Sequence, residues 1–310
     1  MMRTALIFPG QGAQRAGMLS ALPDHAAVHA TRSEAAEVLG QDWRELETND
    51  ALAGARAAQL ALLIAGVATA RLLASAGAAI DVVLGQSVGA FPAAVAAGCL
   101  SFADALTLVR ARASHMASLY PSGFGMVAII GLRAVRVADI VRQSEADGAL
   151  YVSNYNGPLQ TVISGADAAL EAAVEAALAA GARKGERLHI ATPSHCPLLA
   201  PVAAELREVL RGIPLQPPRI AYASASRARL ITDPAAIAED LAANVAEPVR
   251  WHDAASLLVE RGVELFLQAP PGTVLCDPVS EAHPALRSVA LDGLSLDSAL
   301  YLARGDGASA

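Results

Sequence analysis

The feature that most constrains the fold is a short apolar run that leads through a glycine-flanked serine into an alanine-rich segment. The run is Ile80–Leu84, and Gly85-Gln-Ser-Val-Gly89 follows it. A serine between a strand and a helix occupies a strained turn, where a Cβ on either flanking residue would collide with its surroundings. The unpaired N–H groups at the start of the helix favour developing negative charge. The pattern therefore predicts a nucleophilic Ser87, the alternative being an inert serine in a tight turn.

Strand and helix patterns alternate along the chain, which predicts an α/β fold with a parallel sheet covered on both faces. The first strand is expected at Thr4–Phe8 and the last clear one at Val263–Gln268, with early helices over 25–39 and 54–76. The segment 57–80 is very apolar, but Gln59 and Arg71 interrupt it. We therefore expect a helix buried in protein and no membrane span.

A second structural unit is indicated by a change of pattern near residue 122. Its expected strands are Met126–Leu132, Leu150–Asn154, Gln160–Ser164 and Arg187–Ala191, and its expected helices cover 134–146 and 166–180. The order βαββαβ is typical of the ferredoxin-like motif. We therefore predict an α/β-hydrolase-like large domain of residues 1–124 and 191–310, with an inserted ferredoxin-like small domain of residues 125–190.

Composition excludes several classes of function. The net charge is −7 and there is no basic stripe, so a general nucleic-acid binder is not expected. Lys184 is the only lysine, which leaves no Walker-type lysine. The three cysteines, Cys99, Cys196 and Cys276, are far apart, so we expect no disulfide framework and no metal site. The N-terminal apolar run is too short for a signal peptide, and a reducing cytoplasm fits.

A serine nucleophile needs a base, and His195 is the best placed of the seven histidines. It lies in Thr192-Pro-Ser-His-Cys-Pro197, a loop after a predicted strand that prolines hold on both sides. The alternative is a histidine that caps or packs the loop. Seven acidic residues between Ser87 and His195, at positions 139–186, fall in the small domain and none of them ends a large-domain strand, so a hydrolase-type acid is missing from its expected place. We therefore expect a neutral acceptor, such as a backbone carbonyl, to orient the imidazole.

Seven motifs occur in a fixed order along the chain. They are Phe8-Pro-Gly-Gln-Gly-Ala-Gln14, Gly85-Gln-Ser-Val-Gly89, Gly125-Met-Val-Ala-Ile-Ile-Gly131, Asn154-Tyr-Asn-Gly-Pro-Leu-Gln160, Pro193-Ser-His-Cys196, Pro248-Val-Arg-Trp251 and Pro271-Gly-Thr-Val-Leu275. Each motif alone has only modest specificity for one family, but seven motifs in this order are highly specific. Over nearly its whole length the chain resembles the malonyl-CoA:acyl-carrier-protein transacylase family.

The resemblance implies roles for particular residues. Ser87 would attack the thioester while His195 takes its proton, and the backbone N–H groups of Gln11 and Val88 would form the oxyanion hole. An arginine in the helix after the serine would bind the malonyl carboxylate. Helix phase does not separate the two candidates, Arg110 and Arg112. The family spacing, four residues before Met116, favours Arg112.

Two positions depart from the family pattern. Gln86 replaces the common histidine before the nucleophile; glutamine still donates a hydrogen bond but does not titrate. Arg250 stands where some members carry a glutamine near the histidine. A cation close to His195 would oppose imidazolium formation, so we assign Arg250 no orienting role. In the small domain, Asn154, Asn156 and Gln160 are candidate substrate contacts.

Within the family, the chain looks most like the epsilon subunit of malonate decarboxylase. The cues are Ser87-Val-Gly-Ala-Phe91, Tyr120-Pro-Ser-Gly-Phe-Gly-Met126, Ser226-Arg-Ala-Arg229 and Asn244-Val-Ala-Glu-Pro-Val-Arg-Trp-His252. The resemblance implies a coenzyme A thioester as substrate, no permanently bound cofactor, and the carrier subunit of that decarboxylase as acceptor. The alternative acceptor is the acyl-carrier protein of fatty-acid or polyketide synthesis. A serine esterase and a non-catalytic assembly subunit are the alternatives from other classes.

Overall fold

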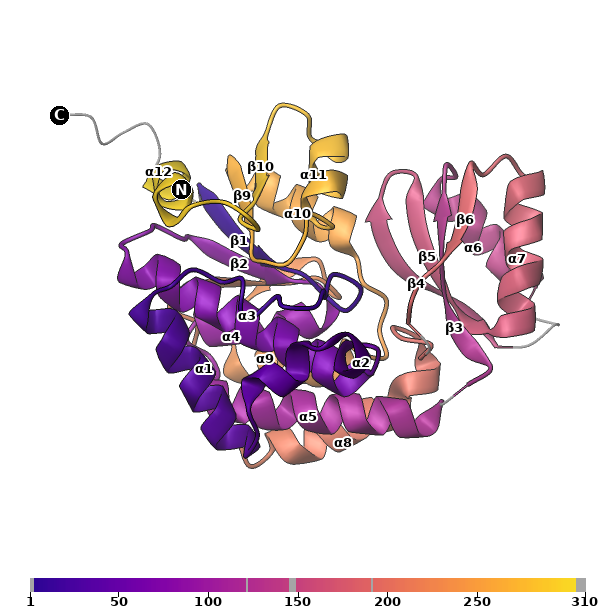
Figure 1. Cartoon of the computed structure of the whole chain (residues 1–310). Coiled ribbons are helices and arrows are strands. Elements are labelled where there is room, and N and C mark those ends of the chain that lie inside the picture. Colours follow the sequence, from indigo (N-terminus) through magenta and orange to yellow (C-terminus); the bar gives the residue numbers. More distant parts are fainter. Residues whose placement is uncertain (1–2, 121, 145–148, 191, 305–310) are drawn as a thin grey trace.

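Two β-sheets organise the chain, and helices cover both of them (Figure 1). The computed structural model describes residues 3–120, 122–144, 149–190 and 192–304. The larger sheet holds the N-terminal and C-terminal parts of the chain, and the smaller sheet holds the middle part. The prediction of a mixed α/β fold with a parallel sheet is confirmed.

The larger sheet has six strands. In spatial order they are β10 (Arg287–Ala290), β9 (Leu265–Gln268), β1 (Thr4–Phe8), β2 (Val82–Gly85), β7 (Ala221–Ser224) and β8 (Arg229–Ile231). All neighbouring pairs are parallel except β7 and β8. Strand β1 has the predicted bounds, β2 begins two residues later and ends one residue later than predicted, and β9 begins two residues later and ends where predicted. Strands β7, β8 and β10 were not predicted, because they are short and two of them carry half-buried or exposed side chains.

Helices pack on both faces of this sheet, because successive side chains of a buried strand point to opposite faces. Leu6 and Phe8 of β1 join one core, while Ala5 and Ile7 join the other. The first core is built with α1 (Ala26–Leu39), α3 (Ala55–Ser75), α4 (Ala90–Ala96), α5 (Phe102–Leu119), α8 (Ala200–Leu210) and α9 (Pro234–Ala243). The second is built with α10 (Trp251–Glu260) and α11 (Cys276–Ala282).

Helix α3 is the apolar segment that resembled a membrane span. Among the described residues it is the one helix long and apolar enough to cross a membrane, but 83% of its most apolar window is buried inside the protein. Helix α3 packs tightly against α4 at Gly66, where an added Cβ would be 2.8 Å from Pro92. The prediction of a helix buried in protein is confirmed.

The smaller sheet is antiparallel. Its spatial order is β4 (Leu150–Gly157), β5 (Gln160–Ala166), β3 (Phe124–Ile130) and β6 (Lys184–Arg187). Helices α6 (Ala134–Gln143) and α7 (Asp167–Ala179) cover one face, where Val127 and Ile129 of β3 are buried. Met126 and Ala128 of the same strand face the other way. The chain order β3-α6-β4-β5-α7-β6 is the order that the sequence predicts.

One strand position was wrong. The last strand of the small sheet was expected at Arg187–Ala191, but β6 covers Lys184–Arg187. Pairing with β3, in which Ile130 lies opposite Lys184, sets this register. The apolar residues 188 and 190 instead pack against Met126 and Ala128 on the face of the sheet that α6 and α7 do not cover. The predicted boundary at residue 191 lies outside the described residues.

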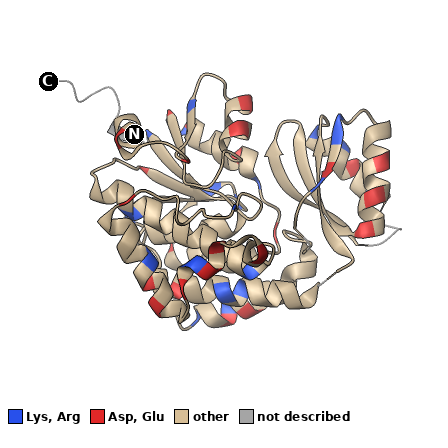
Figure 2. Ribbon diagram, in the orientation of Figure 1, with Lys and Arg blue, Asp and Glu red and all other residues tan. Residues whose placement is uncertain are grey.

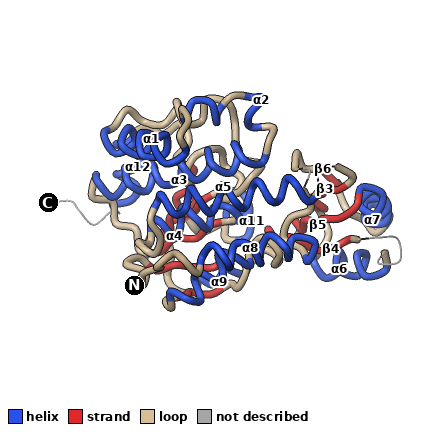
Figure 3. Tube along the Cα trace, turned by 90° about the horizontal axis from the view of Figure 1, so that it is seen from below, coloured by secondary structure: helices blue, strands red, loops and turns tan. Residues whose placement is uncertain are grey.

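The chain passes twice between the two sheets, and backbone hydrogen bonds also link them. The chain enters the small sheet from α5 and returns from it to α8, and these two helices lie side by side when the molecule is seen from below (Figure 3). The N–H of Tyr155 in β4 donates to Val249 O at 2.8 Å, and the N–H of Val249 donates to Ser153 O at 2.8 Å. Lys and Arg are scattered among Asp and Glu over both parts (Figure 2).

Candidate active site

Ser87 occupies the sharp turn between β2 and α4. Its φ of 56° is in the left-handed region, which costs a non-glycine residue energy. Both flanking glycines are sterically required. A Cβ at Gly85 would overlap the backbone of Gly89, and a Cβ at Gly89 would overlap the carbonyl of Phe8 in the neighbouring strand. The local sequence thus lifts the Ser87 hydroxyl out of the sheet at the carboxyl end of a parallel strand.

The structure brings His195 to this hydroxyl, although 108 residues separate the two. Nε2 of His195 lies 2.8 Å from Ser87 Oγ. Nδ1 lies 2.7 Å from Asn244 O and 3.3 Å from Glu247 O. Since carbonyls only accept hydrogen bonds, Nδ1 carries the proton and Nε2 is free to accept the one on Ser87. The acceptor that orients the ring is a backbone carbonyl, as the sequence analysis expected.

The environment of His195 keeps its ring neutral. Burial, and to a smaller extent the nearby Arg112 cation, together lower the pKa of His195 from 6.5 to about 4, although the hydrogen bonds to the two carbonyl groups partly oppose the shift. A neutral imidazole is the form that accepts a proton. The Ser87–His195 pair is therefore in its proton-transfer-competent state throughout the neutral range.

Arg112 of α5 is the second group that reaches Ser87. Its side chain is 1% exposed; Nη2 donates to Ser87 Oγ at 3.1 Å and Nη1 donates to Gln59 Oε1 at 2.5 Å. Its Nε is buried without a hydrogen-bond partner. Burial lowers the pKa of Arg112 to about 9, so the group remains a cation at neutral pH. In the described part of the chain no carboxylate pairs with it.

Arg110, the other candidate on this helix, is half-buried and does not line the cavity around Ser87. Helix phase did not separate the two arginines, but the tertiary structure does. Gln59 was missed as a member of the site. Its one signal was that it interrupts an otherwise apolar helix, and its amide bridges Arg112 to Gln11 Oε1 at 3.1 Å.

Ser87, His195 and Arg112 line a cavity of about 250 Å³ between the large sheet and the open face of the small sheet. Strand-end loops of the large part contribute Gln11 and Gln86, and helix α3 contributes Gln59. The small sheet contributes polar Asn154, Asn156 and Gln160 and the apolar side chains Met126, Ala128 and Val162. The arrangement combines a reactive hydroxyl, a base, an unpaired cation and a partly apolar wall.

The other predicted site residues lie around this centre. Gln86 Nε2 donates to Asn156 Oδ1 at 3.2 Å, which joins the two parts of the molecule across the cavity. Oδ1 of Asn154 is buried without a hydrogen-bond partner. Val88 follows Ser87 in the turn and is fully buried. For Gln11 and Val88, participation in an oxyanion hole stays a prediction.

Arg250 does not line the cavity. It is exposed and pairs with Asp253, with Nη2 2.9 Å from Oδ2. The cation that acts on His195 is therefore Arg112. Within the described ranges, no group of three or more His, Cys, Asp and Glu side chains is arranged to hold a metal ion.

Comparison with known proteins adds the family. The model of the acyl transferase domain matches residues 5–292. The malonyl CoA-acyl carrier protein transacylase of Haemophilus influenzae is 34% identical over 282 residues, which cover 89% of this chain and 90% of the relative. The transacylase of the same name from Bacillus subtilis is 33% identical over 94% of both chains.

Solved structures agree with the sequence relatives. The acyl-carrier-protein S-malonyltransferase of Burkholderia pseudomallei superposes with a TM-score of 0.92 and 37% identity, over 97% of this chain and 100% of the other. A malonyl-transacylase solved in complex with its type II polyketide synthase acyl-carrier protein gives a TM-score of 0.92 and 33% identity, over 96% and 99% of the two chains.

Proposed function

The chain belongs to the acyl transferase domain family and is an acyltransferase, and on this premise we propose that it transfers malonyl from malonyl-CoA to the thiol of an acyl-carrier protein. The observation that carries the proposal is the buried Arg112 cation beside the Ser87–His195 pair. A buried cation that lines a cavity and has no carboxylate partner among the described residues is a ready site for an anionic group. Malonyl brings a free carboxylate to that place.

The reaction proceeds in two half-reactions. The Ser87 hydroxyl gives its proton to His195 Nε2 as Oγ bonds to the thioester carbon. The C–S bond then breaks, and His195 returns the proton to the departing coenzyme A thiolate. In the second half-reaction the carrier thiol gives its proton to His195 and its sulfur bonds to the malonyl ester carbon; the bond from that carbon to Ser87 Oγ breaks, and His195 returns the proton to Oγ. The N–H groups of Gln11 and Val88 stabilise the oxyanion in both steps.

Arg112 selects the acyl group. A guanidinium holds a carboxylate through two parallel hydrogen bonds, and its unpartnered Nε and the Nη2 that now rests on Ser87 are available for this. Acetyl would leave the cation unpaired. That difference is worth about 1.5–3 kcal/mol, or roughly tenfold to hundredfold in rate. Gln86, Asn154 and Asn156 offer amide groups to the rest of the substrate.

Two alternatives are less well supported. A serine esterase of the hydrolase type would have a carboxylate on His195 Nδ1, whereas that atom faces the carbonyls of Asn244 and Glu247. An assembly subunit without activity would not need the short Ser87–His195 contact. No permanently bound cofactor enters the scheme; the coenzyme A thioester is a substrate.

For the physiological acceptor we favour the carrier of fatty-acid or polyketide synthesis over the malonate decarboxylase carrier. The relatives and structures described above are named for transfer to an acyl-carrier protein, and one of them was solved with a polyketide synthase carrier. The decarboxylase assignment rests on the motif cues alone. We also propose a cytoplasmic location, which agrees with three free, buried thiols.

We propose further that the two parts are an α/β-hydrolase-like domain, residues 1–124 and 191–310, and an inserted ferredoxin-like domain, residues 125–190. The parallel order of the large sheet and a serine in the turn after β2 support the first class. The order βαββαβ with an antiparallel sheet supports the second.

The direct test is a covalent adduct. Wild-type protein incubated with malonyl-CoA should gain one malonyl group on Ser87, detected by peptide mass spectrometry, and Ser87→Ala should gain none. The absence of an adduct on the wild type, or the same adduct on Ser87→Ala, would falsify the proposed intermediate.

Selectivity for the acyl group is tested separately. In Arg112→Ala the ratio of the malonyl transfer rate to the acetyl transfer rate should fall roughly tenfold to hundredfold. If the ratio is unchanged, Arg112 does not select the acyl group.

A further inference from the structure

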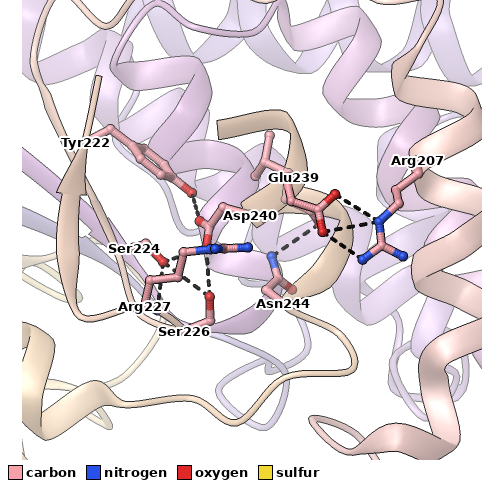
Figure 4. Close-up of polar contacts among 9 residues, drawn as sticks. Arg207, Tyr222, Ser224, Ser226, Arg227, Glu239, Asp240 and Asn244 are labelled. Atoms are coloured by element: carbon pink, nitrogen blue, oxygen red, sulfur yellow. Dashed lines mark hydrogen bonds and ion pairs between the residues drawn. The ribbon is translucent and has the colours of Figure 1, made fainter. Parts of the chain in front are cut away.

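A second group of polar side chains lies buried beside α9, away from the cavity (Figure 4). At its centre is Asp240, which is 1% exposed. Tyr222 donates to its Oδ2 at 2.8 Å; Ser224 and Ser226 donate to its Oδ1 at 2.5 and 2.7 Å. Nε of Arg227 lies 3.8 Å from Oδ1. We call Tyr222, Ser224, Ser226, Arg227 and Asp240 the Asp240 cluster.

The donors of the cluster come from the end of β7 and the turn after it. Ser224 is the last residue of β7 and lies opposite Gly85, the last residue of β2. Two residues after Gly85 the chain reaches Ser87. One side of the cluster is therefore tied, through the register of the sheet, to the strand that carries the Ser87 hydroxyl.

The acceptor of the cluster comes from α9, the helix that leads to the carbonyls around His195. The carbonyl of Asp240 accepts the N–H of Asn244 at 3.0 Å, one helical turn later. The carbonyl of Asn244 in turn accepts from His195 Nδ1 at 2.7 Å. The next residue, Val245, accepts the backbone N–H of His195 at 2.8 Å. The end of this helix thus holds both the ring and the backbone of His195.

We propose that the Asp240 cluster is a positioning device, which fixes the end of α9 against the end of β7 and so sets where His195 stands relative to Ser87. The inference rests on the proposed function, in which the His195–Ser87 geometry governs the rate. Asp240 touches neither of them and acts only through the carbonyls of Asn244 and Val245. A shift of about 1 Å in such a group can cost up to hundredfold in rate.

The chain offers a matched control on the same helix. Glu239, the residue before Asp240, faces the other way and pairs with Arg207 at 2.7 Å, with both side chains more than 40% exposed (Figure 4). Glu239→Gln and Asp240→Asn both replace one carboxylate by an amide. Only the second removes an acceptor from the buried cluster.

The test measures the Nδ1–H NMR signal of His195 and the rate of Ser87 acylation in the full-length chain. With ¹⁵N-histidine labelling, the Nδ1–H signal of His195 is identified by its loss in His195→Gln. We expect Asp240→Asn to shift or broaden this signal and to slow acylation of Ser87 by roughly tenfold or more at saturating malonyl-CoA. The half-saturating concentration should change less than about twofold, since Arg112 and Gln59 lie on other helices. Glu239→Gln should leave the signal and both kinetic values as in the wild type.

The proposal is wrong if folded Asp240→Asn keeps the wild-type signal, or if its acylation rate stays within about twofold of the wild type. Ser226→Ala, which removes one half-buried donor and keeps the carboxylate, should give a smaller change in the same direction and serves if Asp240→Asn fails to fold. An unchanged signal in Ser226→Ala then overturns the proposal. If the wild type forms no malonyl ester, the proposed function fails, while the NMR signal still decides whether the cluster positions His195.

Discussion

Arg112 and Asp240 are both buried charged residues with 1% exposure, yet the protein surrounds them in opposite ways. Asp240 accepts hydrogen bonds from three hydroxyl groups and has an arginine nearby. Arg112 has one amide and one hydroxyl as acceptors, no carboxylate partner in the described part of the chain, and an orphaned Nε.

The two environments have different physical consequences. A buried charge that is fully hydrogen-bonded rigidifies the fold, whereas one left without a counter-ion lowers stability and is a reason to look for a ligand. The Asp240 cluster is therefore expected to hold the site in place, whereas Arg112 is expected to bind the substrate.

Removal of the base should have the largest effect, because both half-reactions pass a proton through it. We expect His195→Ala to lower the rate of malonyl transfer by about 10²–10⁴-fold, measured by single-turnover acylation. His283→Ala, which changes a histidine outside the cavity, should keep the wild-type rate. A His195→Ala enzyme that is acylated as fast as the wild type would show that His195 is not the base.

Deletion of the satisfied charge should be the most destabilising change. We expect Asp240→Ala to lower the free energy of unfolding by about 3–5 kcal/mol, because Tyr222, Ser224 and Ser226 lose a shared acceptor and Arg227 loses its partner. Denaturant unfolding followed by circular dichroism measures this loss. Glu239→Gln on the same helix breaks only a surface pair and should cost less than about 1 kcal/mol. Equal losses of unfolding free energy in the two variants would show that the Asp240 cluster contributes no more to stability than the surface ion pair does.

Acid should destabilise the protein through His195. Its pKa is lowered from 6.5 to about 4 in the folded state, so between these values the unfolded chain binds more protons and stability rises with pH. Relative to His195→Gln, the wild type should lose about 2 kcal/mol of unfolding free energy between about pH 7 and pH 5. Parallel stability curves for the two proteins over this range would show that the folded-state pKa of His195 is not depressed. Because the folded-state pKa of His195 is about 4, the ring stays neutral below pH 6.5, and the initial rate of acylation should persist there.

Removal of the unsatisfied charge should stabilise the protein. We expect Arg112→Met to raise the free energy of unfolding by about 1 kcal/mol or more, because a buried cation without a counter-ion is replaced by an apolar side chain of similar length. Arg110→Met, two residues earlier on α5 and outside the cavity, is the matched control and should change stability little. A marked loss of stability in Arg112→Met, with Arg110→Met unchanged, would mean that Arg112 is structural like Asp240.

Much of the fold followed from local pattern. Strands β1 and β2 and the buried helix around Gln59 could be predicted because burial on both sides leaves a continuous apolar run. Strand β6 was misplaced, since its register depends on pairing with β3 and its own sequence is polar. Strand pairing at the sheet edges is a tertiary property, and short edge strands such as β10 leave little trace in the sequence.

The candidate site divides in the same way. Ser87 and His195 could be named because each lies in a local motif, a glycine-flanked turn and a proline-bounded loop. The choice between Arg110 and Arg112 could not be made from helix phase. The carbonyl that holds His195 could not be named either, because any residue has a carbonyl and only packing brings that of Asn244 to the ring.

Glycine sterics and apolar periodicity act over a few neighbouring residues, so the mixed α/β fold, the strained turn at Ser87 and the candidate base His195 could be predicted from the chain alone. The arginine that faces the cavity and the contacts that hold the ring of His195 follow from the packing of the folded elements. The same packing brings Asp240 together with Tyr222, Ser224 and Ser226, from a helix and a strand that are separate in the chain. These contacts depend on the packing of elements far apart in sequence, where distance and direction, and not residue type, decide which groups meet.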